Sequence, residues 1–339
     1  MKQAIALAEQ GFAADFVTRA GIRWLLSQRL RQEKSSSAHM EAIIEGMSHG
    51  PLAVNTDSAN EQHYEVPAEF FALMLGPHMK YSCALYDDGA RCLEEAEAHM
   101  LKLTCMRACL RDGMDILELG CGWGSLTLAM AKRYPQSRIV AVSNSSSQKR
   151  FIDEQAHHLG LENIEVITSD MNDFETNEKF DRVVSIEMFE HMRNYRLLFK
   201  RIRGWLKDDG RLFFHIFCHK DTPYFFSPDT DKDWMARHFF TGGVMPSYDL
   251  PERFREHLYP MCRWRVSGNN YARTCQAWLD NLDNNRDAAI EILERGDNPE
   301  SALIQFNRWR LFVMACRELF AWDDGNEWFV GHYLFQPQK

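Results

Sequence analysis

The sequence predicts an α/β fold in which helices cover a mostly parallel, Rossmann-like sheet. Strand-like apolar runs lie at 115–119, 138–143, 163–168, 181–186 and 211–217, and helical patterns lie near 124–133, 146–159 and 194–206. Strands and helices that alternate in this way are typical of parallel strands joined by crossover helices. Ligands of such sheets bind beyond the carboxyl ends of the strands, so we expect the first four strands to end around one crevice.

A glycine-rich turn follows the first strand of this pattern. Residues 115–124 read DILELGCGWG, and Gly120, Gly122 and Gly124 separate the apolar strand from the next helix. Their spacing differs from the G-x-G-x-x-G that seats a pyrophosphate at a helix N-terminus. The carboxylate of Glu118 would repel a phosphate, so the turn favours a ligand without one, such as S-adenosyl-L-methionine (SAM). The alternative is an ordinary strand-to-helix turn.

Polar side chains after the second and third strands are candidates for the nucleoside part of this cofactor. The amides of Asn144 and Gln148 can both donate to and accept from ribose hydroxyls. Asp170 could accept from the adenine amino group, with Met171 packed on the ring. Two local roles compete with this interpretation: a serine at 145 or 146 could cap the next helix, and Asp170 could form an Asx turn.

An acidic cluster follows the fourth strand in the sequence SIEMFEH, which covers residues 185–191. Glu187, Glu190 and His191 would share one face if this stretch formed a helical turn. Two carboxylates and an imidazole at the mouth of a sheet suit the binding of an ammonium group and the removal of its proton. The alternative is a solvated helix start that is merely rich in acids.

This cluster matters because methyl transfer from a sulfonium is an in-line displacement that needs a free lone pair on the acceptor. An amine with a pKa of about 10 is protonated at neutral pH, so a nearby base has to take its proton. Aromatic side chains such as Tyr81, Trp328 and Phe329 could hold a cation or shape an apolar pocket. The aromatic segments 63–71 and 81–86 could cover the site as a lid, and the alternative for them is a buried aromatic turn.

Composition excludes several other classes of function. The net charge of −9 argues against nucleic acid or an anionic membrane as the main partner. The nine cysteines lack the spacing of a metal site or a disulfide framework, so no metal is predicted. No apolar run approaches the ~20 residues of a membrane span. We expect a cytoplasmic protein without an integral membrane segment, and a homodimer is left open.

The predicted organisation is a helical cap and lid over residues 1–100 and a SAM-binding core over 101–339. The core would carry insertions at 219–248 and 271–320, the second with one helix over 271–296 and another over 299–320. The end of the chain alternates like a final strand at 327–335, and a break at 34–37 and a loop at 50–62 are expected in the cap. Residues 1 to about 50 form a basic amphipathic helical pattern that favours a cap over a membrane-bound helix.

Taken together, the motifs resemble the cyclopropane-fatty-acid-synthase superfamily of SAM-dependent methyltransferases, and more closely its coclaurine N-methyltransferase-like branch. The resemblance covers residues 63–335 and rests on YSC (81–83), LELGCGWG (117–124), Asn144 with SQ (147–148), EMFEH (187–191) with NY (194–195), FCHK (217–220), DW (233–234) with GVMPS (243–247), and GNEW (325–328). It implies a class I methyltransferase fold, which has a mostly parallel seven-stranded sheet, here with an N-terminal helical cap and inserted helical segments.

The resemblance also implies roles for individual residues. Tyr81, Ser82 and Gly120 would contact the methionine part of SAM, while Glu187, Glu190 and His191 would bind and deprotonate an amine. The full predicted cofactor set is Tyr81, Ser82, Glu118, Gly120, Gly122, Asn144, Gln148, Asp170, Met171 and Ser185. The predicted substrate pocket is Phe217, Trp234, Phe240, Trp328 and Phe329. The product of the cofactor would be S-adenosyl-L-homocysteine.

One set of residues keeps a different reaction open. Cyclopropane synthases hold a bicarbonate base, and Cys83, Glu190, His215 and Tyr271 match the positions that hold it. The acceptor would then be an unsaturated lipid acyl chain, and the product a cyclopropane or a C-methylated chain. Glu187 and the C-terminal segment favour the amine branch instead. Cys83 as a small buried side chain, His215 as an ordinary strand histidine, and a SAM-binding protein without catalysis are the remaining alternatives.

Overall fold

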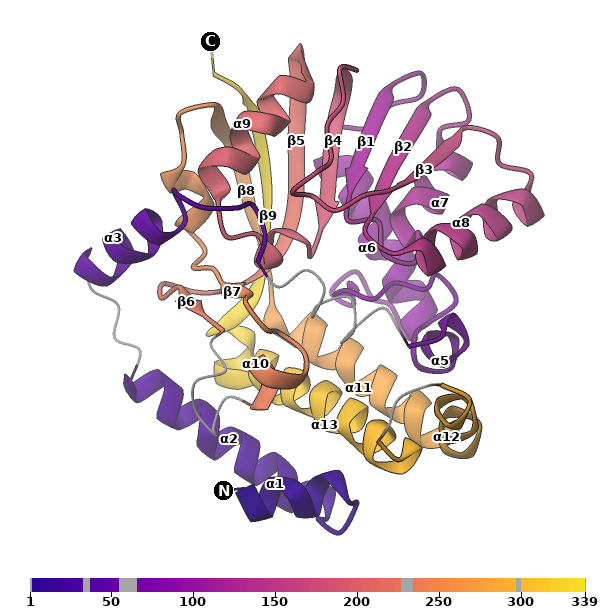
Figure 1. The fold of residues 1–339 in the computed structure, drawn as a ribbon, viewed down its shortest axis with the longest axis vertical. Helices are drawn as coiled ribbons and strands as arrows, with labels where there is room; N and C mark the ends of the chain where they lie inside the picture. Colours follow the sequence, from indigo (N-terminus) through magenta and orange to yellow (C-terminus); the bar gives the residue numbers. More distant parts are fainter. Residues whose placement is uncertain (1, 33–36, 55–65, 227–233, 297–299, 339) are drawn as a thin grey trace.

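The predicted mostly parallel sheet is present in the computed structural model, which describes residues 2–32, 37–54, 66–226, 234–296 and 300–338. Its seven strands lie in the order β3-β2-β1-β4-β5-β9-β8 (Figure 1). They are β1 (Asp115–Leu119), β2 (Arg138–Ser143), β3 (Ile164–Thr168), β4 (Phe180–Ile186), β5 (Leu206–His219), β8 (Leu258–Val266) and β9 (Trp328–Pro337). Strands β1 to β5 are parallel, whereas β9 is antiparallel to both of its neighbours.

Helices cover both faces of the sheet because successive strand residues point to opposite sides. Ile116 and Val184 pack with α6 (Leu93–Arg107) and α7 (Ser125–Arg133). Leu117 and Val183 pack on the other face with α9 (Tyr195–Trp205). Helix α8 (Ser146–Leu159) lies beside β2 and β3.

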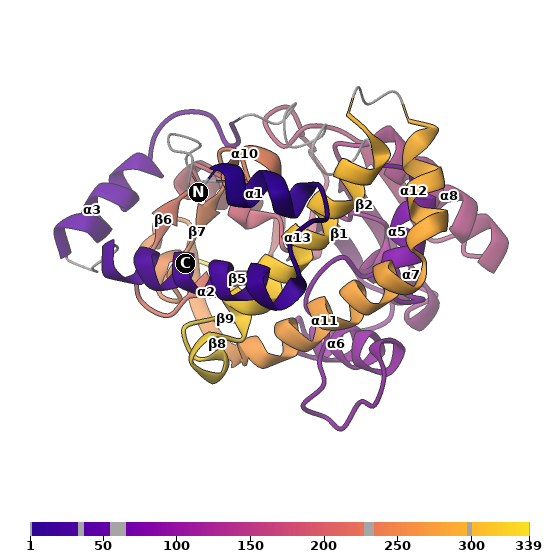
Figure 2. The ribbon, with the colours of Figure 1, turned by 90° about the horizontal axis from the view of Figure 1, so that it is seen from below.

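A second group of helices gathers at one end of the sheet (Figures 1 and 2). It contains α1 (Lys2–Glu9), α2 (Asp15–Gln32), α5 (Ala68–Met74), α10 (Trp234–His238), α11 (Gly268–Asn284), α12 (Arg286–Glu294) and α13 (Ala302–Phe320). The remaining elements are α3 (Ser37–Gly46), the short strands β6 (Tyr224–Phe225) and β7 (Val244–Met245), and the 3-10 turns η1 (Phe189–His191), η2 (Leu250–Arg253) and η3 (Trp322–Gly325).

The N-terminal basic helix α2 is held against α13 by a buried acid. Arg19 and Arg23 each place a guanidinium nitrogen 2.8 Å from a carboxylate oxygen of Glu318, whose side chain is only 2% exposed. This contact supports the expected cap position of the helix. None of the helices in the described ranges is long and apolar enough to cross a membrane.

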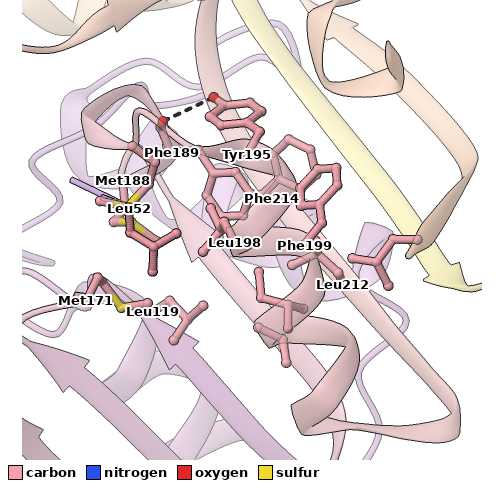
Figure 3. Packing of buried hydrophobic residues seen from close by; sticks show 14 of the residues in the cluster. Leu52, Leu119, Met171, Met188, Phe189, Tyr195, Leu198, Phe199, Leu212 and Phe214 are labelled. Carbon is pink, nitrogen blue, oxygen red and sulfur yellow. Dashed lines mark hydrogen bonds between the residues drawn. The ribbon is translucent and has the colours of Figure 1, made fainter. Parts of the chain in front are cut away.

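Aromatic packing fixes the turn that follows β4 (Figure 3). The rings of Phe189 and Phe214 stack with centroids 4.5 Å apart and an interplanar angle of 1°. The hydroxyl of Tyr195 donates to the backbone oxygen of Phe189 at 3.1 Å. Because Phe189 is fully buried, the residues on either side of it are held in place at the carboxyl end of β4.

Most predicted elements are confirmed, and the differences have local causes. The single helix expected over 271–296 is two helices, α11 and α12, separated at Asn285. Strand β8 was not predicted because, as the sheet's last strand, it exposes polar and apolar residues alike. The expected break at 34–37 and loop at 50–62 fall largely outside the described residues. Helix α6 crosses residue 100, and the division into cap and core stays a prediction.

Gly268 lies where the start of α11, the end of α13 and the start of β9 meet, and it provides a test of this packing. A Cβ atom there would lie 2.2 Å from the backbone oxygen of Trp328 and 2.5 Å from that of Phe320. We expect G268A to lower the free energy of unfolding by about 1–3 kcal/mol, because the overlap is with backbone.

The matched control is G204A in α9, where an added Cβ meets no atom within 4 Å. Alanine is favoured over glycine inside a helix by up to about 1 kcal/mol, so this variant should be at least as stable as the parent protein. Urea unfolding followed by circular dichroism measures both effects. Equal stability of the two variants would contradict the packing described.

Candidate active site

A cavity of about 1120 Å³ lies at the carboxyl ends of the parallel strands. Gly120, Asn144, Ser169 and Glu187, which follow β1, β2, β3 and β4, all contribute to its wall. Residues of α2, α10, α11 and α13 line it from the opposite side. The prediction that the first four strands end around one crevice is therefore confirmed.

Most residues predicted for the site line this cavity. They are Tyr81, Ser82, Glu118, Gly120, Gly122, Asn144, Gln148, Asp170, Met171, Glu187, His191, Phe217, Trp234, Phe240 and Tyr271. Six others do not line it: Cys83, Ser185, Glu190, His215, Trp328 and Phe329. The six are buried in the wall behind it, where they contact other parts of the fold.

Three of these six make contacts that explain their position. The hydroxyl of Ser185 donates to the backbone oxygen of Leu119 at 2.8 Å, so it joins β4 to β1. The indole N–H of Trp328 donates to the hydroxyl of Tyr224 at 3.3 Å. Phe329, the next residue along β9, packs its ring under the guanidinium of Arg265 at 4.1 Å.

The glycine turn after β1 is shaped for close approach by a ligand. Gly120 has a φ of +75°, and a Cβ there would lie 2.7 Å from the side chain of Met188. Gly122 has a φ of +52°, and a Cβ added there would meet no atom of the described residues within 4 Å, so its backbone faces open space. The turn can therefore bring a ligand against main-chain atoms that a side chain would otherwise cover.

The carboxyl group of Glu118 lies at the end of β1, next to this turn, and is uncharged. Its side chain is 2% exposed and accepts a hydrogen bond from the Thr127 hydroxyl at 2.6 Å. Burial raises the pKa of the Glu118 carboxyl to about 8, so the group is mostly protonated at neutral pH. A cationic ligand beside it would favour the ionised form.

The residues after β2 and β3 have both local and ligand-facing roles. Both local alternatives are present: Ser145 caps α8, and Asp170 forms an Asx turn by accepting from the Asn172 N–H at 2.7 Å. Gln148 accepts from the Ser143 hydroxyl at 2.6 Å through Oε1. Its buried Nε2 has no partner in the described part of the chain, so a ligand acceptor would satisfy it.

The acidic cluster does not form the helical turn that its spacing predicted. Glu187 has a φ of +49°, in the left-handed region, and the 3-10 turn η1 begins only at Phe189. The reversal sends the three side chains in different directions. Glu187 and His191 line the cavity, whereas Glu190 is fully buried and accepts from the Phe217 N–H at 2.8 Å.

Donors surround the Glu187 carboxylate on both oxygens. Oε1 accepts from the Cys83 N–H at 3.1 Å and lies 3.1 Å from His215 Nε2. Oε2 accepts from the Tyr271 hydroxyl at 2.6 Å. Three of the four residues predicted to hold a bicarbonate ion thus surround a carboxylate of the protein itself.

The charges around Glu187 act in opposite directions on its proton affinity. Burial raises the pKa of the Glu187 carboxyl, and Lys80, the Tyr271 hydroxyl and the Cys83 N–H oppose this by favouring the ionised form. A carboxylate whose pKa is raised above the usual value binds a proton more readily, which suits a group that would accept a proton from a substrate ammonium.

Lys80 is a buried member of the site that the sequence analysis missed. It is 3% exposed, and its ammonium donates to the hydroxyl of Ser82 and to the backbone oxygen of Cys83. Burial lowers the pKa of Lys80. No spacing rule singles out a lysine before Tyr-Ser-Cys, because its role depends on Glu187, which lies 107 residues away in the sequence.

The predicted lid segment is anchored as part of the cavity wall. Two backbone N–H groups of the segment donate to side chains of helix α11. The Ala84 N–H donates to Thr274 Oγ1 at 3.1 Å, and the Tyr86 N–H donates to Asn270 Oδ1 at 2.7 Å. The preceding loop is held by Glu97 of α6, which accepts from two backbone N–H groups.

An aromatic wall lies beside these polar groups. The ring of His191 stacks on Phe240 with centroids 5.0 Å apart, and the ring of Tyr271 stacks on Phe320 at 4.2 Å. Phe217 contacts Phe240 edge-on at 5.4 Å. The cavity therefore offers an apolar, aromatic surface next to a carboxylate and an imidazole.

Comparison with known proteins places this geometry in a family. The family model "Mycolic acid cyclopropane synthetase" matches residues 54–327. (S)-coclaurine N-methyltransferase of Thalictrum flavum subsp. glaucum is 35% identical over 97% of this chain and 94% of that protein.

Solved structures agree with this placement. A crystal structure of coclaurine N-methyltransferase bound to N-methylheliamine and SAH superposes with a TM-score of 0.93 at 34% identity, covering 98% of this chain and 99% of that one. A cyclopropane synthase of Mycobacterium tuberculosis shares the fold, with a TM-score of 0.71 at 24% identity, over 85% of this chain and 100% of that one. The resemblance predicted from the motifs is confirmed: the chain belongs to the mycolic acid cyclopropane synthetase family, and its relatives there include the coclaurine N-methyltransferases.

Proposed function

We propose that this protein transfers the methyl group of SAM to the nitrogen of a small apolar amine. The observation that carries the proposal is the Glu187 carboxylate, which three donors fix at the wall of an aromatic cavity. The relatives named as coclaurine N-methyltransferases support the same chemistry.

The cofactor-binding groups follow the edge of the sheet in order. Backbone at Gly120 and Gly122, with Tyr81 and Ser82, would hold the methionine part. The amides of Asn144 and Gln148 would contact the ribose, and Asp170 and Met171 would contact the adenine. When bound, SAM supplies an electrophilic methyl group on a sulfonium, and the residues of the protein orient the acceptor in line with it.

Glu187 removes the proton that blocks the amine. A free amine with a pKa of about 10 reaches the site as an ammonium, which the carboxylate attracts. The proton passes from the ammonium nitrogen to the free side of the carboxylate, and the nitrogen lone pair becomes available for the methyl group. His191, which lines the same wall, assists by binding or accepting the proton.

The amine is favoured over the unsaturated lipid because of where the Glu187 side chain lies. Cyclopropane formation needs a base for the cation that forms after methyl addition, and the predicted base was a bicarbonate ion. The Cys83, His215 and Tyr271 groups expected to hold that ion are engaged by Glu187. A homodimer and a cytoplasmic location stay predictions from the sequence.

The base role of Glu187 predicts a separation of chemistry from cofactor binding. We expect E187Q to lower the rate of methyl transfer by about 10²–10⁴-fold, because the amide cannot accept the proton. H191A should lower the rate as well. Both variants should bind SAM as the parent protein does, measured by calorimetry beside a radiolabelled-methyl assay on an amine panel.

The matched control is E154Q, which changes an exposed acid on α8 and should leave rate and binding unchanged. An E187Q variant that loses SAM affinity in proportion to its rate would assign Glu187 to the cofactor instead.

A second prediction concerns the proton held by Glu118. With a pKa of about 8 in the free protein, this carboxyl is protonated at pH 6–7.5. Cationic SAM favours its ionised form, so binding releases a proton and the Kd for SAM falls as pH rises, by up to about tenfold per pH unit. E118Q has no such proton, so its Kd should vary less over the same range. Titration in buffers of different ionisation enthalpy would detect the proton, and identical pH profiles would exclude this role.

The lipid alternative predicts a different product. Incubation with SAM and unsaturated phospholipid vesicles should leave the acyl chains unchanged if the amine proposal holds. A mass gain of one methylene group on those chains, together with no turnover of the amine panel, would replace it with cyclopropane formation or C-methylation.

A further inference from the structure

A chain of hydrogen bonds continues behind Glu187, away from the cavity. His215 Nδ1 lies 3.0 Å from His332 Nε2, and His332 Nδ1 lies 2.8 Å from a guanidinium nitrogen of Arg107. His215 and His332 are directly paired across β5 and β9, and Arg107 is the last residue of α6. The series Glu187–His215–His332–Arg107 therefore joins the turn after β4 to β5, β9 and α6.

The guanidinium fixes the direction of every bond in this series. Arginine has only donors, so His332 Nδ1 must accept. In a neutral imidazole the other nitrogen then carries the hydrogen, so His332 Nε2 donates to His215 Nδ1. By the same rule His215 Nε2 carries a hydrogen and donates to Glu187 Oε1.

Both imidazoles are neutral in this environment. His215 and His332 are fully buried, and burial together with nearby Lys80 and Arg107 lowers the pKa of each well below its usual value. The contact between His215 and Glu187 is thus a hydrogen bond from a neutral ring. It stabilises the ionised carboxylate without placing a second buried charge beside it.

The series cannot carry away the proton that Glu187 receives. His215 Nε2 already bears a hydrogen, and the far end is a guanidinium that does not give up a proton in proteins. The proton must leave through the cavity. The series can instead set the ring orientation and the tautomer of His215, and through them the ionisation of Glu187.

We propose that Arg107 and His332 are positioning residues that lock His215 as an Nε2–H donor and so keep Glu187 ionised and aimed at the cavity. The inference rests on the proposed function, since it assigns these residues to the same reaction. Neither residue lines the cavity, so each acts through its neighbour.

A second contact of Arg107 supports its role as a positioning residue. Its guanidinium also lies over the ring of Trp264 at 5.1 Å, which holds its plane against the sheet. The tautomer of His215 matters because a neutral ring with its hydrogen on Nδ1 would turn the lone pair of Nε2 toward the Glu187 carboxylate. That arrangement would favour the protonated acid and remove the base.

The pH dependence of the base involves every titratable group around it. These groups are Lys80, Cys83, Glu190, His191, His215, Tyr271, Cys275 and Cys316. All are retained in variants of Arg107 and His332. A change in the profile that R107M and H332L share therefore reports the hydrogen bonds of the series, because H332L leaves the charge of Arg107 in place.

The test compares R107M and H332L, which break the series, with H332Q. Glutamine can accept from Arg107 and donate to His215, so it preserves both bonds. We expect kcat to fall roughly 10–100-fold in R107M and H332L, by analogy with the loss seen when the hydrogen-bond partner of a metal-binding histidine is removed. The acidic limb of kcat/KM should move to higher pH, and SAM affinity should stay within twofold. H332Q should recover most of the rate.

The control is R111M, an exposed arginine in the loop after α6, which should behave as the parent protein. Unchanged rates in folded R107M and H332L would overturn the proposal. So would an H332Q variant as slow as H332L at equal stability, because that result would indicate a packing role only.

A second measurement does not depend on activity. Nitrogen-15 NMR of histidine-labelled parent protein should show His215 with its hydrogen on Nε2, assigned by comparison with H215N. Hydrogen on Nδ1 would overturn the inference even if amines are methylated. If the parent protein methylates no amine, the proposed function fails, while the tautomer still decides whether the series fixes His215.

Discussion

A carboxylate that is mostly removed from water and held by neutral donors is the constraint on which the rest of the site depends. An ionised carboxylate is costly to remove from water unless hydrogen bonds replace its solvation. Glu187 receives them from the Cys83 N–H, His215 and Tyr271. These donors come from the anchored 81–86 segment, β5 and α11, so the carboxylate is fixed in this position only when the sheet and the helical layer meet.

The position of the Glu187 carboxylate also depends on the backbone at the end of β4, where Glu187 has a left-handed conformation. A left-handed conformation at a non-glycine residue is strained, and it persists only where the surroundings determine it. Here Phe189 stacks on Phe214 of β5, and the Glu187 N–H donates to the His215 backbone oxygen at 2.8 Å. Strand β5 thus holds the turn through the Phe214 ring and the His215 backbone oxygen, and it also donates to the Glu187 carboxylate through the His215 side chain. The core packing and the position of the Glu187 carboxylate are consequently not separable at this point.

Local patterns predicted the frame of the site but not its inner arrangement. Apolar runs and glycines located β1 and its turn, and serine after β2 located the start of α8, because these signals act within a few residues. The spacing of Glu187, Glu190 and His191 wrongly predicted one helical face, since the conformation of Glu187 is decided by β5 and α11. Lys80, Arg107 and His332 gave no signal, because each acquires its role from a partner far away in the sequence.

A base that belongs to the polypeptide differs physically from a bound anion in the same place. A bound ion brings its own proton affinity and leaves when its concentration falls, whereas the ionisation of Glu187 is set by Lys80, Tyr271 and the imidazole behind it. The protein can therefore tune the base through residues that never meet the substrate. An ammonium acceptor needs such a base before the methyl group arrives, because its lone pair is blocked until then. An alkene needs one only afterwards, so a permanent carboxylate facing the cavity matches the order of events in amine methylation.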